Sequence, residues 1–382
     1  MNIPFLDLRA QHAEVGAAVR AAVEAVLEDQ QCVLGPHLAR FEAAMAAFCR
    51  VPYAVGVGSG TDALALALAA LGVGPGTRVL TTPFSFFATA STIARLGATP
   101  VFADVEPETL TLDPAAAAEV LGREPAIAGI VVVHLFGRLA HIRELQRLAA
   151  AHGCWLLEDA AQAAGARLDG IAAGGFGRAG ALSFYPTKNL GGIGDGGMVL
   201  TADNGLAAAV RRDRNQGLVA PYVHESLGLC SRLDAVQAAV LGVKLRWLDE
   251  WNRRRREVAA WYTERLTAHG LAGWDEAPLR LPRPAGEAHV FHVYCIRARA
   301  RDALQAHLAA EGIGTQVYYR TPLHCQPALA GRVAVPCGVP ESVRAADEVL
   351  ALPMYPQLAQ TQVERVVEAI ARFYARRTAD CR

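Results

Sequence analysis

The sequence predicts an α/β protein with a large N-terminal domain on a mainly parallel sheet and a smaller C-terminal α/β domain. Short apolar runs alternate with helical patterns from about residue 50 to residue 245. The runs lack the clean apolar–polar alternation of half-exposed strands, which indicates a sheet covered by helices on both faces. The pattern then changes, and 382 residues suffice for two domains. We expect a large domain over 1–245 and a small domain over 246–382.

Seven apolar segments of the large domain are expected to be strands, with helices between them. Gly72 closes the first such helix, TDALALALAALG, and FFATASTIARLG (86–97) and IRELQRLAAAHG (142–153) are two more. The expected strands are YAVGVG (53–58), RVLTTP (78–83), TPVFADV (99–105), AIAGIVVVHLFG (126–137), CWLLEDAA (154–161), ALSFYP (181–186) and GGMVLTA (196–202).

One long helix, over about 233–269, is expected to lead into the small domain. Its apolar residues recur in steps of three and four along one face. They are Val236, Val240, Val243, Trp247 and Trp251. The run RRRR (253–256) is expected to be a solvated helix face. After a proline-rich connection at 277–287, we expect strands at 289–298 and 315–319, a helix at 301–312 and a terminal helix at 361–377.

Charge and composition argue against several classes of protein. The 37 basic and 37 acidic residues give no net charge, so nothing favours nucleic acid or an anionic membrane as a partner. No segment reaches the roughly 18 apolar residues that cross a bilayer, and the N-terminus lacks a signal pattern. Neither the eight scattered cysteines nor the eleven histidines have the spacing of metal ligands. We expect a cytoplasmic protein with reduced thiols and no metal.

A glycine turn at GVGSGTDALALAL (56–68) joins a strand to a helix, which suits a phosphate because amide hydrogens and the helix dipole meet there. A dinucleotide fold would need glycine at position 61, where the chain has Thr61, and an acidic residue about 20 positions on. No GK[ST] follows, which argues against a nucleotide P-loop. The alternative is a tight turn with a capping residue. Otherwise the turn indicates a phosphate site for a ligand that is not a dinucleotide.

Three side chains then follow on successive strands. Asp159 ends an apolar strand, Gln162 comes three residues later, and Lys188 lies between an aromatic segment and a glycine-rich run. The carboxyl ends of parallel strands are where such sheets bind ligands. Asp159 is either a helix cap or the partner of a protonated cofactor nitrogen, and Lys188 is either a surface charge or a desolvated amine that forms an imine. Together with a phosphate site, they match the needs of pyridoxal phosphate (PLP).

With these residues in place, the chain resembles the DegT/StrS family of PLP-dependent nucleotide-sugar aminotransferases. The resemblance runs nearly end to end, through IPFLDLRAQ, GSGTDAL, PFSFFATA, EDAAQ, SFYPTKNLGGIGDGGM, SRLDAVQAA, TPLHCQPA and LPMYP. It implies the fold-type I aminotransferase architecture, with a mainly parallel seven-stranded sheet. It also implies a homodimer with active sites at the subunit boundary.

The resemblance also assigns roles to individual residues. Lys188 would link covalently to PLP, Asp159 would pair with the pyridine nitrogen and Gln162 would bind the ring hydroxyl. The phosphate would be held by Gly60, Thr61 and Ser183. Phe87 would stack on the ring, with ordinary core packing as its alternative. Arg232, Tyr318, Tyr319 and His324 are candidates for the substrate side. Where the family usually has an asparagine that reaches a phosphate across the dimer, this chain has Cys230, a poor donor.

The function implied is transfer of an amino group from L-glutamate, which leaves 2-oxoglutarate, to a keto-sugar on a nucleoside diphosphate. Three alternatives stay open. Related sugar dehydratases replace the lysine with histidine, so Lys188 favours transamination. The acceptor is otherwise a keto-cyclitol. A non-catalytic PLP-binding regulator is the third reading, although no DNA-binding extension or basic patch supports it. His134, at the end of IVVVH within the segment 126–137, is expected to be a satisfied strand-end residue.

Overall fold

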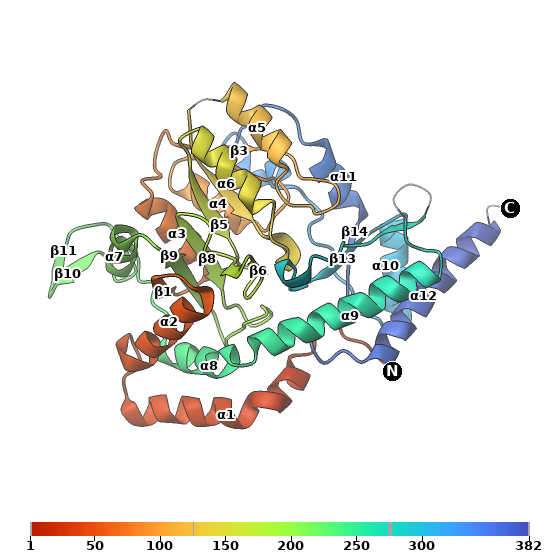
Figure 1. Cartoon of the computed structure of the whole chain (residues 1–382), viewed down its shortest axis with the longest axis horizontal. Coiled ribbons are helices and arrows are strands. Elements are labelled where there is room, and N and C mark those ends of the chain that lie inside the picture. The colour runs from red at the N-terminus through yellow and green to blue at the C-terminus, as the bar shows by residue number, and fades with distance from the viewer. Residues whose placement is uncertain (1, 125, 274–276, 381–382) are drawn as a thin grey trace.

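A seven-stranded sheet forms the centre of the computed structural model, which describes residues 2–124, 126–273 and 277–380 (Figure 1). The strand order is β1-β9-β8-β5-β4-β2-β3. β9 pairs antiparallel with both neighbours, and the other pairs are parallel, which confirms the mainly parallel sheet. The strands are β1 Tyr53–Val57, β2 Arg78–Thr81, β3 Thr99–Phe102, β4 Ile127–Val133, β5 Trp155–Asp159, β8 Ala179–Ser183 and β9 Gly197–Thr201.

Helices cover both faces of this sheet, as the unalternating strands predict. One apolar core lies between the sheet and α2, α5, α6 and α8, and a second lies between the sheet and α3, α4 and α7. The sheet is therefore buried on both sides. These helices are α2 Gly35–Cys49, α3 Gly60–Ala70, α4 Ala88–Arg95, α5 Pro114–Arg123, α6 Ile142–Ala151, α7 Asn204–Asp213 and α8 Ala235–Leu245. An N-terminal helix, α1 (Leu8–Asp29), packs along α8 (Figure 1).

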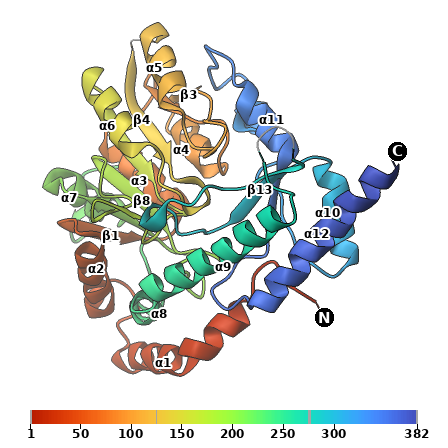
Figure 2. The ribbon, with the colours of Figure 1, turned by 45° about the vertical axis from the view of Figure 1, so that its right-hand side comes forward.

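The C-terminal part has its own small sheet and its own core. Strands β12, β13 and β14 are antiparallel neighbours, and α9 and α12 lie side by side against them (Figure 2). The N-terminal Ile3 belongs to this core and bridges to Ile313. The two-domain division at residue 245 stays a prediction, and Ile3 lies on the far side of it. The elements are α9 Leu248–Ala268, β12 Leu279–Arg280, β13 Tyr294–Ala298, α10 Arg301–Ala310, α11 Pro340–Glu348, β14 Val349–Leu352 and α12 Gln360–Asp380.

Two short hairpins lie outside the two larger sheets. β6 (Arg167–Leu168) pairs with β7 (Ile171–Ala172) beside the large sheet. β10 (Leu218–Ala220) and β11 (Val223–His224) form the second hairpin, which projects from the body near α7 (Figure 1). Both lie outside the strand–helix repeat that the sequence pattern reveals.

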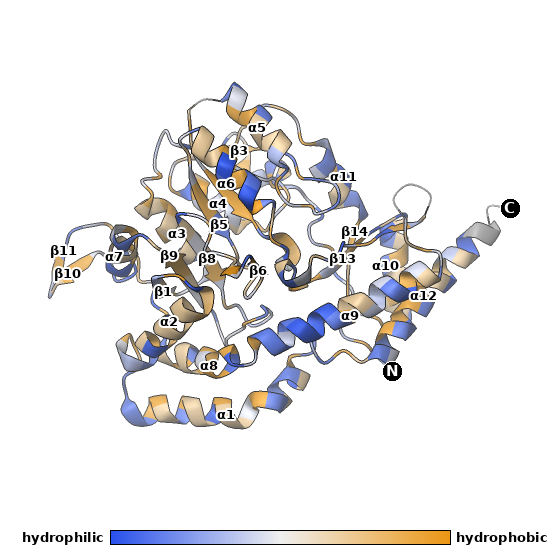
Figure 3. Cartoon of the chain, in the orientation of Figure 1, coloured by the Kyte–Doolittle hydropathy of each residue, from blue (hydrophilic) through white to orange (hydrophobic). Residues whose placement is uncertain are grey.

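Three expectations for the C-terminal half are wrong. The helix expected over 233–269 is two helices, because the α-helical hydrogen bonding is interrupted after Leu245, where Trp247 N–H donates to Lys244 O, three residues back. The segment 315–319 has no strand and makes only an isolated bridge at Gln316. The run 253–256 lies on the strongly hydrophilic first half of α9 (Figure 3), yet Arg255 within it is buried.

Within the described ranges, no helix combines the length and apolar composition needed to cross a membrane. The same residues contain no cluster of three or more His, Cys, Asp or Glu side chains placed to hold a metal ion.

Candidate active site

A cavity of about 500 Å³ opens at the carboxyl ends of the parallel strands. Its walls come from the ends of β4, β5 and β8, the start of α3, the loop after β8 and two segments of the C-terminal part. Eight of the predicted site residues line it, and they are Gly60, Thr61, Asp159, Gln162, Ser183, Lys188, Tyr318 and Tyr319. Residues far apart in the sequence are thus brought together at the edge where open α/β sheets bind ligands.

Lys188 and Asp159 form the charged centre of this cavity. Burial lowers the pKa of the Lys188 amine to about 8, and the charge of Asp159 opposes that shift. A lysine with such a pKa is partly neutral near physiological pH, so it is available as a nucleophile or a base. Lys188 N–H bonds to Tyr185 O at 2.8 Å, which fixes the lysine in a turn directly after β8.

Asp159 is buried, and its carboxylate accepts two hydrogen bonds from the described part of the chain. Thr89 Oγ1 donates to Oδ2 at 2.7 Å, and Ala161 N–H donates to Oδ1 at 3.3 Å. Ser85 lies 2.8 Å from Thr89 Oγ1 and donates to it, because the Thr89 hydrogen is committed to the carboxylate. Burial raises the pKa of the Asp159 carboxyl, while these hydrogen bonds and Lys188 counteract the rise. A carboxylate in that setting gains from a cationic N–H partner.

The start of α3 faces the end of β8 across a very short gap. Ser59 caps the helix, since its hydroxyl accepts from Asp62 N–H at 3.0 Å. A Cβ placed on Gly60 would lie 2.6 Å from Ser183 Cβ, so only glycine fits there. The first amide hydrogens of a helix have no partner inside the helix, and here they point toward the Ser183 end of the cavity wall. The arrangement offers backbone and hydroxyl donors to an anion.

Gln162 is already held by the protein on both ends of its amide. Its Oε1 accepts from Phe136 N–H at 2.7 Å, and its Nε2 donates to Tyr319 Oη at 3.1 Å. Burial raises the pKa of Tyr319, so its hydroxyl keeps its proton. One Nε2 hydrogen of Gln162 and the hydroxyl hydrogen of Tyr319 are left for a ligand. Tyr319 thereby couples the C-terminal part to the large sheet at the site.

The prediction for Phe87 does not fit this geometry. Phe86 lines the cavity, whereas Phe87 lies at the start of α4 and outside the lining. Neighbouring side chains on a turn point in different directions. A shift of one residue in the motif therefore points to Phe87 where Phe86 lines the cavity. The Phe86 ring lies 6.3 Å from that of Tyr319, which places it at the cavity wall.

Two of the predicted substrate residues, Arg232 and His324, are not among the residues that line the cavity. Arg232 donates to Asn215 Oδ1 at 2.7 Å and to Cys230 Sγ at 3.0 Å. His324 lies against Phe102, and burial lowers its pKa. Within a single chain, neither side chain is placed to contact a ligand of this cavity.

Several lining residues were missed by the sequence analysis. Six of them have polar side chains, and they are Ser59, Ser85, Tyr185, Thr187, Asp195 and His292. Asp195 lies within the glycine-rich run after Lys188, where the sequence indicated a role for the backbone and none for a side chain. His292 comes from a segment expected to be strand, where alternation gives no sign of a ligand-facing imidazole.

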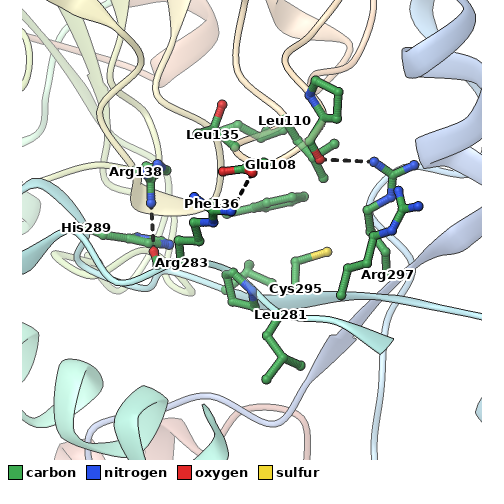
Figure 4. A pocket seen from close by; sticks show the side chains of 15 residues that line it. Glu108, Leu110, Leu135, Phe136, Arg138, Leu281, Arg283, His289, Cys295 and Arg297 are labelled. Atoms are coloured by element: carbon green, nitrogen blue, oxygen red, sulfur yellow. Dashed lines mark hydrogen bonds and ion pairs between the residues drawn. The ribbon is translucent and has the colours of Figure 1, made fainter. Parts of the chain in front are cut away.

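A second hollow lies nearby, between the large sheet and the C-terminal part, and is rich in arginine (Figure 4). Its arginines are paired: Arg283 with Glu108 at 2.6 Å, Arg138 with Arg283 O at 2.7 Å, and Arg297 with Pro107 O at 3.1 Å. With about 30 Å³, it has room for little more than water. These contacts hold the two parts of the chain together and carry no reactive group.

The large cavity fits PLP on the chemistry of its donors. The Gly60–Ser183 approach offers donors to a phosphate, the under-partnered Asp159 suits a protonated ring nitrogen, and Lys188 supplies a neutral amine to an aldehyde. Phe86 supplies an aromatic face at the wall. Each group that the cofactor requires has a matching side chain or backbone donor.

Comparison with known proteins gives the same answer. Residues 14–371 match the DegT/DnrJ/EryC1/StrS aminotransferase family. The chain is 44% identical to a "pleiotropic regulatory protein" of Geobacillus stearothermophilus, over 98% of this chain and 99% of the relative. It is 41% identical to the dTDP-3-amino-3,4,6-trideoxy-alpha-D-glucose transaminase of Streptomyces venezuelae, over 97% and 95%. It is 42% identical to the UDP-N-acetyl-3-dehydro-alpha-D-glucosamine 3-aminotransferase of Acidithiobacillus ferrooxidans, over 97% of each chain.

The fold has equally similar solved counterparts. The crystal structure of S. venezuelae DesV in complex with a ketimine intermediate superposes with a TM-score of 0.91 at 42% identity, and the match covers 97% of this chain and 98% of that one. Sequence motifs, fold and site geometry thus agree, and the chain belongs to the DegT/DnrJ/EryC1/StrS family of PLP-dependent aminotransferases.

Proposed function

We propose that this protein transfers an amino group from L-glutamate to the keto group of a nucleotide-linked hexose in amino-sugar biosynthesis. The observation that carries the proposal is the pairing of Lys188, with a pKa lowered to about 8, and the buried Asp159 in one cavity. A protein that uses this fold only to bind ligands does not need a lysine amine that is neutral near pH 8. That amine favours catalysis over a purely regulatory role.

The chain's residues divide the work as follows. When bound, PLP supplies an aldehyde that condenses with amines and a ring that accepts an electron pair. Lys188 holds the cofactor and then, as a free amine, moves the proton at the substrate carbon. Asp159, oriented by Thr89, keeps the ring nitrogen protonated. Gly60, Thr61 and Ser183 bind the phosphate, and the wall around Phe86 and Tyr319 excludes water.

We further propose that the amino group arrives at C3 of the sugar. The two sugar-named relatives described above, at 41% and 42% identity, are both named for a nitrogen at C3. Their nucleotides differ, so the nucleotide is left to experiment. A keto-cyclitol acceptor has less support, because both relatives are named for a nucleotide-linked sugar.

A homodimer is part of the proposal. The hairpin of β10 and β11 projects from the body (Figure 1). Large apolar side chains on the hairpin and just after it are exposed. Tyr222 is 96% exposed and Leu227 106% exposed, which is unusual for apolar side chains of a monomer. A second copy of the chain is the natural cover, and Arg232 with Cys230 lies at the base of this segment. Such a dimer would place this segment next to the partner's cavity, where the resemblance implies that the residue at position 230 lies.

The test of function is a panel of dTDP- and UDP-linked 3-keto and 4-keto hexoses with L-glutamate, read by mass spectrometry for the amino-sugar product. Product from a 3-keto substrate supports the proposal, and product from a 4-keto substrate alone moves the nitrogen to C4. PLP uptake without turnover of any sugar or cyclitol would point to the regulator. Light scattering of the wild type against Tyr222→Asp tests the dimer.

A further inference from the structure

His292 lies in the wall of the catalytic cavity, immediately before β13, and has no role assigned above. It also lines a smaller adjoining cavity of about 280 Å³, together with Thr187 and Tyr318. The side chain is half-buried, and the charge of Lys188 acts on it, so the ring stands close to the reacting amine. A polar group in this position would contact the substituents next to the carbon atom whose proton Lys188 moves.

The hydrogen bonds around Asn189 fix which ring nitrogen of His292 carries the hydrogen. Asn189 Nδ2 donates to Asn252 Oδ1 at 2.8 Å and to Val290 O at 3.1 Å. Both amide hydrogens are therefore used, and Asn189 Oδ1 is the acceptor that faces His292 Nδ1 at 3.1 Å. An oxygen acceptor at that distance requires Nδ1–H, so Nε2 carries a lone pair.

The surroundings also keep the ring neutral. Burial is the main cause that holds the pKa of His292 well below its usual range, and the charges of Lys188 and Arg255 add to it. Arg255 donates to the backbone carbonyls of Phe291, His292 and Met354. A positive charge on the His292 ring would be repelled by the charges of both Lys188 and Arg255. His292 is thus a fixed acceptor and not a donor.

In the described part of the chain, Nε2 of His292 has no hydrogen-bond partner, and it is not among the buried polar atoms left unpaired. It therefore faces the cavity. We propose that His292 recognises the sugar through a hydrogen bond. Its Nε2 accepts this bond from the donor group on C2, next to the carbon that receives nitrogen. This inference rests on the proposed function and narrows its substrate class to sugars with a hydroxyl or an amide N–H at C2.

The two named substrates share this property. The trideoxyglucose relative lacks oxygen at C4 but keeps a hydroxyl at C2, and the glucosamine relative carries an N-acetyl N–H at C2. A donor at C2 is thus common to both, whereas a donor at C4 is not. An acceptor without a hydrogen of its own suits either group.

The experiment measures the affinity of the holoenzyme for two probes by calorimetry: a dTDP-linked 3-amino sugar with its C2 hydroxyl, and the 2-deoxy analogue. The wild type should prefer the hydroxyl probe by about five- to tenfold, the range of one neutral hydrogen bond. His292→Gln keeps an acceptor near the Nε2 position and should retain the preference. His292→Asn keeps the bond to Asn189 but places no acceptor in the cavity, and its preference should fall to about one.

The ratio of the two affinities within each variant is the readout, so a general loss of folding or of cofactor does not imitate the effect. A role limited to holding Asn189 predicts the reverse order, with His292→Asn like the wild type and His292→Gln impaired, and that result overturns the proposal. Nitrogen-15 NMR of the ring gives a second readout. A neutral Nδ1–H tautomer at pH 6 is expected, and a charged ring overturns the proposal as well. If the wild type binds neither these probes nor the corresponding UDP-linked pair, the proposed function fails, and this inference falls with it.

Discussion

Glu158 and Asp159 are neighbours on β5, both buried, and they point to opposite faces of the same sheet. Glu158 is saturated by the protein. Three backbone N–H groups and His134 donate to its carboxylate, from Gly174 at 2.8 Å, Phe176 at 2.6 Å, Gly177 at 2.7 Å and His134 Nε2 at 2.8 Å. Asp159 has only the donors Thr89 and Ala161, the second at 3.3 Å.

The contrast separates a structural carboxylate from a functional one. A buried charge costs free energy unless hydrogen bonds compensate it. Glu158 finds its compensation in the chain and ties the loop at 174–177 to the sheet. His134 is satisfied as expected, because its Nδ1 accepts from Ala140 N–H at 3.1 Å. On the cavity side, Asp159 has carboxylate lone pairs that accept no hydrogen bond from the described residues. These lone pairs are available to a cationic ring nitrogen.

The substitution of Lys188 is expected to have the largest effect on turnover. Lys188→Ala removes the amine that links to PLP and acts as base, and the turnover rate should fall by about 10³- to 10⁴-fold. Mass spectrometry after borohydride reduction should find no cofactor attached. Lys244→Met is the matched control, since Lys244 is also buried, has a lowered pKa and donates to Gly191 O at 2.6 Å. Retention of the covalent cofactor by Lys188→Ala would contradict the assignment.

Glu158→Gln tests the structural side of the comparison. The amide cannot accept the hydrogen bonds of all four donors, and loss of a buried charge network typically costs about 3–5 kcal/mol. Chemical denaturation should show the loss in unfolding free energy. Turnover per folded, cofactor-loaded molecule should stay near that of the wild type, and a large drop in that value at unchanged stability would reverse the roles given to the two carboxylates.

Asp159→Asn should do the opposite. Without the carboxylate, the ring nitrogen loses the group that keeps it protonated, and turnover should fall by about 10²- to 10³-fold. Denaturation should show little change, because burial already raises the pKa of this carboxyl and the amide needs no compensating charge. The cofactor's absorption spectrum would report the change independently of turnover. A destabilised but active variant would count against the reading.

The pH dependence of PLP uptake by the cofactor-free protein sharpens the role of the Lys188 environment. The neutral amine reacts, and the neutral fraction rises with pH up to the pKa of about 8. Between pH 6 and 7 the uptake rate should increase about tenfold, and above about pH 8.5 it should level off. A rate that keeps rising to pH 10 would indicate an ordinary, solvated lysine.

The smallest effect concerns the aromatic wall. Phe86→Ala should weaken PLP affinity by roughly three- to tenfold, the value of one aromatic stacking contact, while Phe87→Ala should change it by less than about twofold. Equilibrium dialysis of PLP against both variants measures the difference. Equal losses would show that the two rings share the contact.

The catalytic pair was predictable because strand ends can be read from the sequence. Apolar runs locate the strands, and Asp159 and Lys188 follow two that lie next to each other in the sheet. His292 was not predictable, because its place in the cavity arises when the C-terminal part folds back on the large sheet. The burial of Arg255 was hidden for a similar reason, since its partners are carbonyl groups, which carry no sequence signal.

Other errors come from local geometry that periodicity does not capture. The apolar pattern continues through Trp247 and Trp251, yet the helix axis changes direction between α8 and α9. Phe86 and Phe87 are equivalent by composition, and only the turn before α4 decides which ring faces the cavity.

The position of Ile3 has a consequence for chain connectivity. This residue is fully buried in the C-terminal core, and its backbone exchanges hydrogen bonds with Gly312 and Gly314. The C-terminal core thus includes a residue from the N-terminal segment, and the strands of the large sheet lie between the two in the sequence. No single cut would yield two intact halves. A C-terminal fragment starting at residue 246 would lack one of its own core residues, whereas a circular permutant that joins the region of Ile3 to the last helix would keep every core contact on one continuous stretch.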